Sequence, residues 1–201
     1  MKHPDVFSGV FPVSEVLIDR AETAARLHAA RDFEDPTIDR CLDRLLKEIR
    51  YQYTGVRLPV TVTGSVCDFG FAKAESRNLA GNLYGCNEVF LFGVTTGLGV
   101  DRLLARLAAL GTAEHFITDA LSSAAAESLC EKTARMLAQN VPCRPRFSPG
   151  YGDLSLSFQR PLLQRIDAYE RLGITLNNAS LMTPMKSVTA IMGIEPATNH
   201  P

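Results

Sequence analysis

The sequence predicts an α+β fold, a mixed or antiparallel sheet with helices packed on it, and three observations indicate this class. Apolar residues recur at a 3.6-residue period between Ile38 and Ile49, and residues 113–140 contain neither glycine nor proline, as in helices. Residues 56–66 and 87–97 are rich in β-branched and aromatic side chains, which is typical of strands. The two kinds of segment do not alternate as in a βαβ chain, so a doubly wound parallel sheet is not favoured.

Residues 1–201 are predicted to form one domain, with a helical N-terminal part (1–55) and an α+β core (56–195). The clearest N-terminal helix spans residues 36–53, with Asp35 as candidate N-cap and Pro36 in the first turn. Its apolar stripe has helical spacing and consists of Ile38, Leu42, Leu45, Leu46 and Ile49.

The two strand-like stretches differ in expected position. Pro59 cannot donate a ladder hydrogen bond, which places residues 56–66 at a sheet edge. Residues 89–94 are nearly all apolar, so that strand is expected to be central and covered on both faces.

Helices dominate the next part of the chain. Residues 100–110 predict a helix that ends at Gly111. Residues 113–140 contain neither glycine nor proline and would span about 40 Å as one helix. The small Ser and Ala residues at its centre would let another backbone approach closely. Residues 155–173 predict a helix capped by Ser155 or Ser157 and stopped by Gly173, and residues 174–194 predict two short strands around Pro184.

Composition excludes several function classes. The chain is 46% hydrophobic and 21% charged with a net charge of -1, so its overall charge does not draw it toward nucleic acid or an anionic membrane. Five scattered cysteines without a Cys-x-x-Cys pair predict reduced thiols, and four distant histidines predict neither a metal site nor a catalytic triad. The N-terminus lacks the apolar region of a signal peptide and no stretch is long enough to span a membrane. We therefore expect a cytoplasmic protein.

Two segments carry candidate binding residues. In "RFSPGYGD", Arg146 offers a fork for a carboxylate, and extended backbone at Phe147 and Ser148 offers polar groups to a flat ligand. Gly150 permits positive φ, and Tyr151 supplies a ring for stacking or for contact with a cation. From these residues alone, a plain Pro-Gly turn with a surface arginine is slightly favoured over a binding loop.

The second segment is the small-residue helix, where Ser123, Glu127 and Glu131 lie on one line. This line is either a solvated face or a place where Glu127 receives an ammonium or a ribose hydroxyl. The nearby basic residues are most simply solvated; they are Lys132, Arg135, Arg144 and Arg146. The loop "GVTTGLG" lacks the Gly-Lys-Ser/Thr ending of a phosphate loop and is interpreted as a strand-to-helix turn.

Taken together, "RFSPGYGD", "DALSSAAAES" and "LMTPMKSVTAIMGI" resemble the activation (reactivation) domain of cobalamin-dependent methionine synthase, and more closely its free-standing bacterial relatives. That family has an Arg-x-x-Pro-Gly-Tyr loop, a Glu in an alanine-rich helix and a terminal strand similar to Met-Pro-x-x-Ser-Val-Ser-Gly. The resemblance covers residues 89–195. In this chain Thr189 and Ala190 replace the last Ser-Gly, and the tyrosines that follow this strand in full-length enzymes are missing, so we expect weaker ligand binding.

The resemblance implies a role in keeping vitamin B12 active during methionine biosynthesis. Such domains bind S-adenosylmethionine, which remethylates oxidised cobalamin. Arg146 would hold the methionine carboxylate, Ser148 and Gly150 would offer backbone contacts, and Tyr151 and Glu127 would contact the ligand. The chain lacks the Asp-x-His-x-x-Gly cobalamin-ligand motif, so a separate methionine synthase or corrinoid protein would supply the cobalamin. No catalytic acid, base or nucleophile is implied.

Two alternatives stay open. The chain could be a non-catalytic interaction module that keeps the fold and has lost the ligand. It could also be an independent methyltransferase with a small-molecule acceptor. The sequence carries no prediction of oligomeric state.

Overall fold

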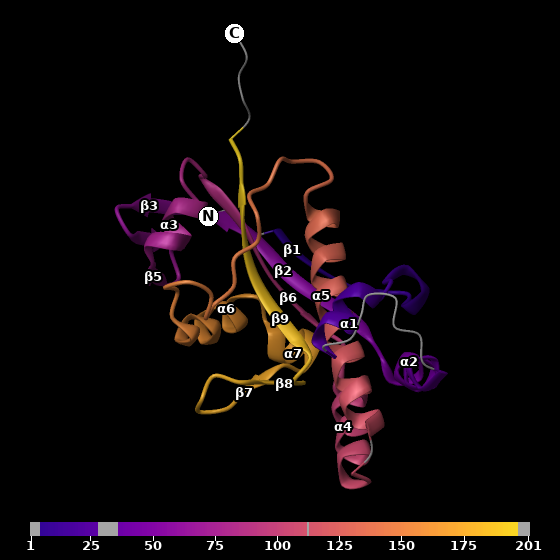
Figure 1. The fold of residues 1–201 in the computed structure, drawn as a ribbon. Coiled ribbons are helices and arrows are strands. Elements are labelled where there is room, and N and C mark those ends of the chain that lie inside the picture. The colour runs from indigo at the N-terminus through magenta and orange to yellow at the C-terminus, as the bar shows by residue number, and fades with distance from the viewer. Residues whose placement is uncertain (1–4, 28–35, 112, 197–201) are drawn as a thin grey trace.

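A four-stranded sheet forms the centre of the protein (Figure 1). The structure is a computed structural model that describes residues 5–27, 36–111 and 113–196. The strand order is β1-β2-β6-β9, and each strand is antiparallel to its neighbours. These strands are β1 (Asp5–Phe11), β2 (Tyr51–Pro59), β6 (Glu88–Thr95) and β9 (Ser187–Ile194). The predicted α+β class with an antiparallel sheet is confirmed.

Helices and two small sheets surround this sheet. One small sheet contains β3 (Thr61–Thr63), β4 (Val66–Asp68) and β5 (Lys73–Glu75), and the other contains β7 (Thr175–Leu176) and β8 (Met182–Thr183). The α-helices are α1 (Arg20–Arg26), α2 (Pro36–Glu48), α3 (Arg77–Asn82), α4 (Leu98–Ala109), α5 (Ala113–Leu137), α6 (Gln159–Arg165) and α7 (Ala168–Leu172). Two short 3-10 helices are η1 (Val13–Glu15) and η2 (Leu156–Phe158).

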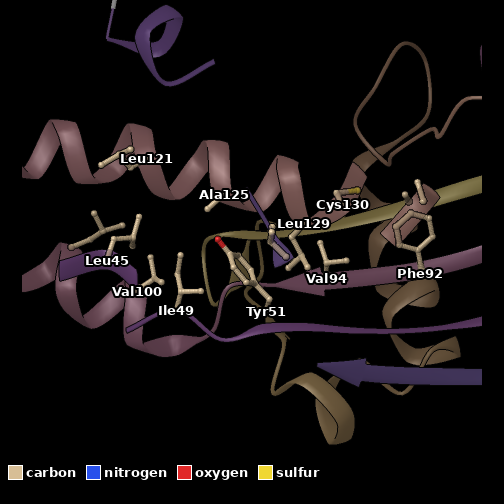
Figure 2. Packing of buried hydrophobic residues seen from close by; sticks show 14 of the residues in the cluster. Leu45, Ile49, Tyr51, Phe92, Val94, Val100, Leu121, Ala125, Leu129 and Cys130 are labelled. Carbon is tan, nitrogen blue, oxygen red and sulfur yellow. The ribbon is translucent and has the colours of Figure 1, made fainter. Parts of the chain in front are cut away.

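Strand β6 is buried on both faces because helices cover each side of the sheet. Phe92 and Val94 belong to an apolar cluster with residues of α2, α4 and α5 (Figure 2). Val89 and Leu91 belong to a second cluster with residues of α3, α6 and α7. Alternate side chains of a strand point to opposite faces, so one strand supplies both clusters. The prediction of a central strand here is confirmed.

Helix α5 is unbroken over 25 residues, about 38 Å at 1.5 Å per residue. It packs against α1, α2 and α4 and against β6 and β9. Ala124 and Ala125 are completely buried and Ala126 is 4% exposed. Their small side chains allow elements to approach the helix from several directions, which explains why α5 has no single apolar stripe.

The N-terminal part differs from the prediction that residues 1–55 are helical. Residues 5–11 form the edge strand β1, and β2 already begins at Tyr51. Phe7 and Phe11 pack on the core while Val10 is exposed, which is the period-two pattern of an edge strand. Helices α1 and α2 do lie in this part, and the predicted cap Asp35 lies outside the described residues. The assignment of residues 1–201 to one domain stays a prediction.

Two further predictions need correction. Strand β2 is not an edge strand, because β1 pairs with it up to Arg57 and Pro59 is only its last residue. Residues 155–173 form η2, α6 and α7 rather than one helix, and the break coincides with Asp167 in the left-handed region at φ 51°. Gly173 ends α7 as predicted, and the Ser155 side chain accepts the N–H of Ser157. The last predicted short strand is the eight-residue β9.

Candidate ligand-binding site

The segment after α5 returns alongside β9 and carries Arg146 back to the helix. The Arg144 N–H donates to the Gly193 carbonyl at 2.8 Å. Phe147 exchanges both backbone hydrogen bonds with Ile191, at 2.8 and 2.7 Å. These bonds make residues 143–147 an irregular extra strand at the β9 edge, and they fix where the Arg146 side chain begins.

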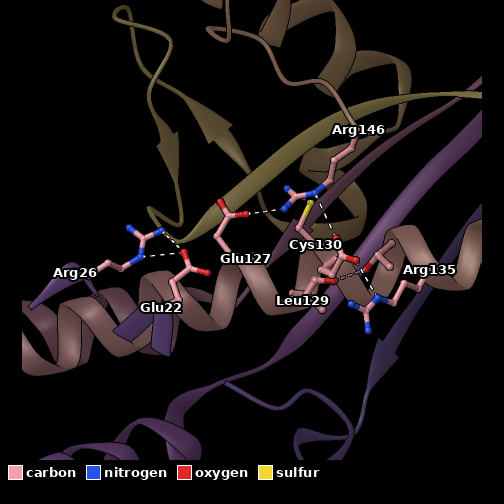
Figure 3. A network of polar contacts seen from close by, with 9 residues as sticks. Glu22, Arg26, Glu127, Leu129, Cys130, Arg135 and Arg146 are labelled. Carbon is pink, nitrogen blue, oxygen red and sulfur yellow. Dashed lines mark hydrogen bonds and ion pairs between the residues drawn. The ribbon is translucent and has the colours of Figure 1, made fainter. Parts of the chain in front are cut away.

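Arg146 contacts three residues of α5 (Figure 3). Its Nη2 donates to Glu127 Oε2 at 2.9 Å, its Nη1 lies 3.2 Å from Cys130 Sγ, and its Nε lies 3.8 Å from Glu131 Oε2. Burial raises the pKa of the Cys130 thiol to about 12, so the thiol stays protonated at neutral pH. The structure therefore brings together two of the predicted site residues, Arg146 and Glu127.

A groove of about 700 Å³ opens beside this pair. One wall is the C-terminal half of α5, and the other is the N-terminal segment from the end of β1 to α1. Five carboxylates and three cations line it; they are Glu15, Asp19, Glu22, Glu127 and Glu131, and Lys132, Arg135 and Arg146. Arg26 also pairs with Glu22 at 2.8 Å, so one carboxylate is in excess. A groove of this charge suits a ligand that carries positive charge.

Sequence reasoning missed the N-terminal wall. Lys132 of α5 holds it by an ion pair to Glu15 at 3.2 Å, and the same ammonium lies 4.9 Å from the centre of the Phe11 ring. Asp19 caps α1 by accepting the N–H groups of Ala21 and Glu22. The Asp-x-x-Glu spacing at residues 19–22 is a helix-start signal that could have placed α1, but nothing local indicates that α1 lies against α5.

The other predicted site residues, Ser148, Gly150 and Tyr151, do not line this groove. They form a turn in which the Tyr151 N–H donates to the Ser148 carbonyl at 3.0 Å and the Gly150 N–H donates to the Leu154 carbonyl at 2.9 Å. Gly150 and Gly152 have positive φ values of 87° and 55°, as the turn prediction requires. The Tyr151 ring is 69% exposed and stands edge-on to Phe147.

The predicted free backbone edge at Phe147 is wrong, because β9 occupies both of its backbone groups. At Ser148 only the carbonyl is occupied, and its donor is the Tyr151 N–H of the same turn. Within residues 5–27, 36–111 and 113–196, its N–H has no hydrogen bond. Residues 147 and 148 therefore offer one backbone donor, the Ser148 N–H, rather than the continuous edge that we expected.

Asp153 fixes the far end of the loop to α3. Its carboxylate accepts hydrogen bonds from the Ser76 hydroxyl and from the N–H groups of Arg77 and Asn78. The Ser76 hydrogen bond is the main reason why the pKa of Asp153 lies below its usual value. The loop is therefore attached at both ends, to β9 through Phe147 and to α3 through Asp153.

The basic cluster is not free. Lys132 pairs with Glu15, Arg135 with Glu131 and Arg144 with Glu195, in addition to the Arg146 contacts. The "GVTTGLG" segment behaves as a structural turn, since the Thr95 hydroxyl accepts the Gly97 N–H at 3.1 Å. Within the part of the chain that the structure describes, no group of three His, Cys, Asp or Glu side chains could hold a metal ion. In the same residues, no helix is both long and apolar enough to cross a membrane.

The fold and this groove define a class, an antiparallel α+β domain with an arginine–glutamate pair between its long helix and the segment that pairs with its C-terminal strand. Comparison with solved structures identifies a domain with the same fold. The chain is similar to the MetH reactivation domain, whose crystal structure is of the domain bound to AdoHcy. The match has a TM-score of 0.72 and 14% sequence identity, and it covers 100% of this chain and 81% of the other. No family model and no curated protein matches the chain.

The chain therefore has the fold of the MetH reactivation domain. At this level of identity the likeness extends to the fold, and the roles of individual side chains stay predictions.

Proposed function

We propose that this protein binds S-adenosylmethionine in the groove beside Arg146 and supports the reductive methylation of cobalamin. One observation carries the proposal: Arg146 and Glu127, far apart in sequence, meet at a groove on the fold of a domain that binds AdoHcy. A planar guanidinium fork matches a carboxylate, and an excess of carboxylates suits a ligand with an ammonium and a sulfonium.

The chemistry expected of the chain is positioning. Arg146 would orient the amino acid end of the ligand, and Tyr151, which does not line the groove, would contact a part of the ligand that extends beyond it. The cobalt of cobalamin would supply the methyl acceptor. We infer that the cobalamin comes with a separate methionine synthase or corrinoid protein in the cytoplasm, because the chain has no cobalamin-ligand motif.

Calorimetric titration with S-adenosylmethionine tests the binding proposal. Arg146→Ala should weaken binding by about 10- to 100-fold, since a charge-assisted hydrogen bond contributes roughly 1.5–3 kcal/mol. Arg160→Ala is the matched control, because Arg160 is an exposed arginine of α6 outside the groove. Absence of binding to the wild-type protein, or equal binding to Arg146→Ala, would refute the proposal.

One observation favours a second candidate, an interaction module without a ligand. The Arg146 side chain already has α5 partners and the Phe147 backbone is bonded to β9, so the site is internally satisfied. In that case a purified corrinoid protein would bind wild type and Arg146→Ala with equal affinity, and S-adenosylmethionine would not change that affinity.

A further inference from the structure

All three nitrogens of the Arg146 guanidinium face groups of α5 (Figure 3). Glu127 holds Nη2 at 2.9 Å, Cys130 Sγ lies 3.2 Å from Nη1, and Glu131 lies 3.8 Å from Nε. Cys130 is fully buried, whereas the side chains of Arg146 and Glu127 are 29% and 34% exposed. Glu131 is also accessible, but Arg135 holds it at 2.8 Å. The Arg146–Glu127 contact is thus the close contact to Arg146 that a ligand in the groove can reach.

Nη2 takes part in both of the ways in which a guanidinium binds a carboxylate with two hydrogen bonds. Arginine binds a carboxylate with two hydrogen bonds along either of two edges, Nε/Nη2 or Nη1/Nη2. Both edges include Nη2, which already donates to Glu127. A ligand carboxylate on either edge therefore lies beside the Glu127 carboxylate. Two like charges around one nitrogen repel each other, so a plain carboxylate ligand must force Glu127 away.

Forcing Glu127 away without compensation is unfavourable in this groove. The displaced carboxylate would lose its cation. The other cations at this lining, Lys132, Arg135 and Arg26, already pair with Glu15, Glu131 and Glu22. An ammonium beside the ligand carboxylate removes this penalty. The ligand carboxylate then takes Arg146 and the ligand ammonium takes Glu127, so four charges alternate and none is left unpaired.

We propose that the Arg146–Glu127 ion pair is a charge filter that opens only to a zwitterionic α-amino acid group and excludes ligands with a carboxylate alone. Glu127 is the specificity-determining residue of this filter. Cys130 is a positioning residue, because it holds Nη1 while Glu127 changes partner. Glu131 pairs with Arg135 at 2.8 Å, and its 3.8 Å contact with Nε leaves the Nε/Nη2 edge to the ligand carboxylate. This inference rests on the proposed function and adds the reason for ligand selection.

The experiment compares two ligands on two proteins by calorimetry at fixed ionic strength. The ligands are S-adenosylhomocysteine and the same molecule without its α-amino group. Wild type should bind the amino compound at least tenfold more tightly. Glu127→Gln should bind the desamino compound more tightly than wild type does, and its preference for the amino compound should fall below about threefold, because the like-charge repulsion is gone.

Glu114→Gln is the matched control. Glu114 is also a glutamate of α5 in an ion pair with an arginine of another helix, Arg44 at 2.5 Å, but it lies outside the groove. This variant should keep the wild-type preference, and thermal unfolding should show that both variants fold. If wild type binds both ligands equally, or Glu127→Gln keeps the wild-type preference, the filter is refuted while the proposed function stands. If wild type binds neither ligand, both fail.

Discussion

Replacing Tyr51 by phenylalanine should stabilise the protein, because the Tyr51 hydroxyl is buried without a hydrogen-bond partner among the described residues. The side chain is 0% exposed, and its oxygen points toward Ala125 in the small-residue stretch of α5 (Figure 2). A buried hydroxyl without a partner costs roughly 1–3 kcal/mol. The lost packing of one oxygen offsets part of this gain. We expect Tyr51→Phe to raise the free energy of unfolding by about 1 kcal/mol.

Urea and thermal unfolding measure this change. A gain of about 1 kcal/mol corresponds to a rise in Tm of roughly 2–4 °C for a chain of this size, with an unchanged urea m-value. Tyr53→Phe is the control, because Tyr53 lies on the same strand but is only half-buried, and it should change stability by less than about 0.5 kcal/mol. A loss of stability in Tyr51→Phe would refute the reasoning and would indicate that the hydroxyl has a buried partner.

The same burial predicts a pH effect. Burial raises the pKa of Tyr51 above its ordinary value near 10. Above about pH 10 the unfolded state therefore releases the Tyr51 proton while the folded state retains it, and stability falls as the pH rises. Tyr51→Phe should lose less stability than wild type between about pH 10 and 11. Parallel curves for the two proteins would contradict this assignment.

Three other substitutions test the packing of α5 and the geometry of the loop that carries Gly152 and Asp153. Leu129→Ala removes a fully buried side chain of α5 and should lower the free energy of unfolding, measured by urea titration, by about 2–5 kcal/mol. A loss below about 1 kcal/mol would mean that α5 is loosely packed. Gly152→Ala places a side chain on a residue with a φ of 55°, and the new Cβ would lie 2.7 Å from Asn78 Nδ2. It should lower the free energy of unfolding by more than about 1 kcal/mol. An unchanged free energy would show that the loop relaxes. Asp153→Asn should lower Tm at neutral pH. This difference from wild type should disappear as the pH falls below about 4, because the Asp153 carboxylate becomes protonated as the pH passes its lowered pKa. A Tm difference that persists in acid would exclude the carboxylate as its cause.

Local patterns predicted the elements that are covered on all sides or that have clear ends. The apolar run of β6 indicated a strand with two buried faces, and the absence of glycine and proline indicated one long α5. Strand β1 was missed because its alternation is short and contains Gly9, although Phe7 and Phe11 follow the correct period. The break at Asp167 could not be seen, since a left-handed aspartate has no strong sequence signal.

The sequence indicated which residues could form the candidate site, but it did not indicate how those residues lie relative to one another. The order Glu127, Arg146, Tyr151 suggested a binding loop, but the placement of Arg146 depends on residues 143–147 pairing with β9, which lies far away in sequence. The same pairing removed the free backbone edge expected at Phe147. The acidic wall formed by Glu15, Asp19 and Glu22 depends on how α1 packs against α5, which is also a tertiary effect.

The attachment of the loop at both ends has a consequence for binding kinetics. Because Phe147 is bonded to β9 and Asp153 to α3, a ligand at Arg146 does not have to order a free loop. If the proposed ligand binds there, little conformational entropy would be lost on association, and the slow step would be the exchange of partners between Arg146 and Glu127. Mutations that loosen the loop should therefore slow association, whereas those that weaken the ion pair should accelerate it.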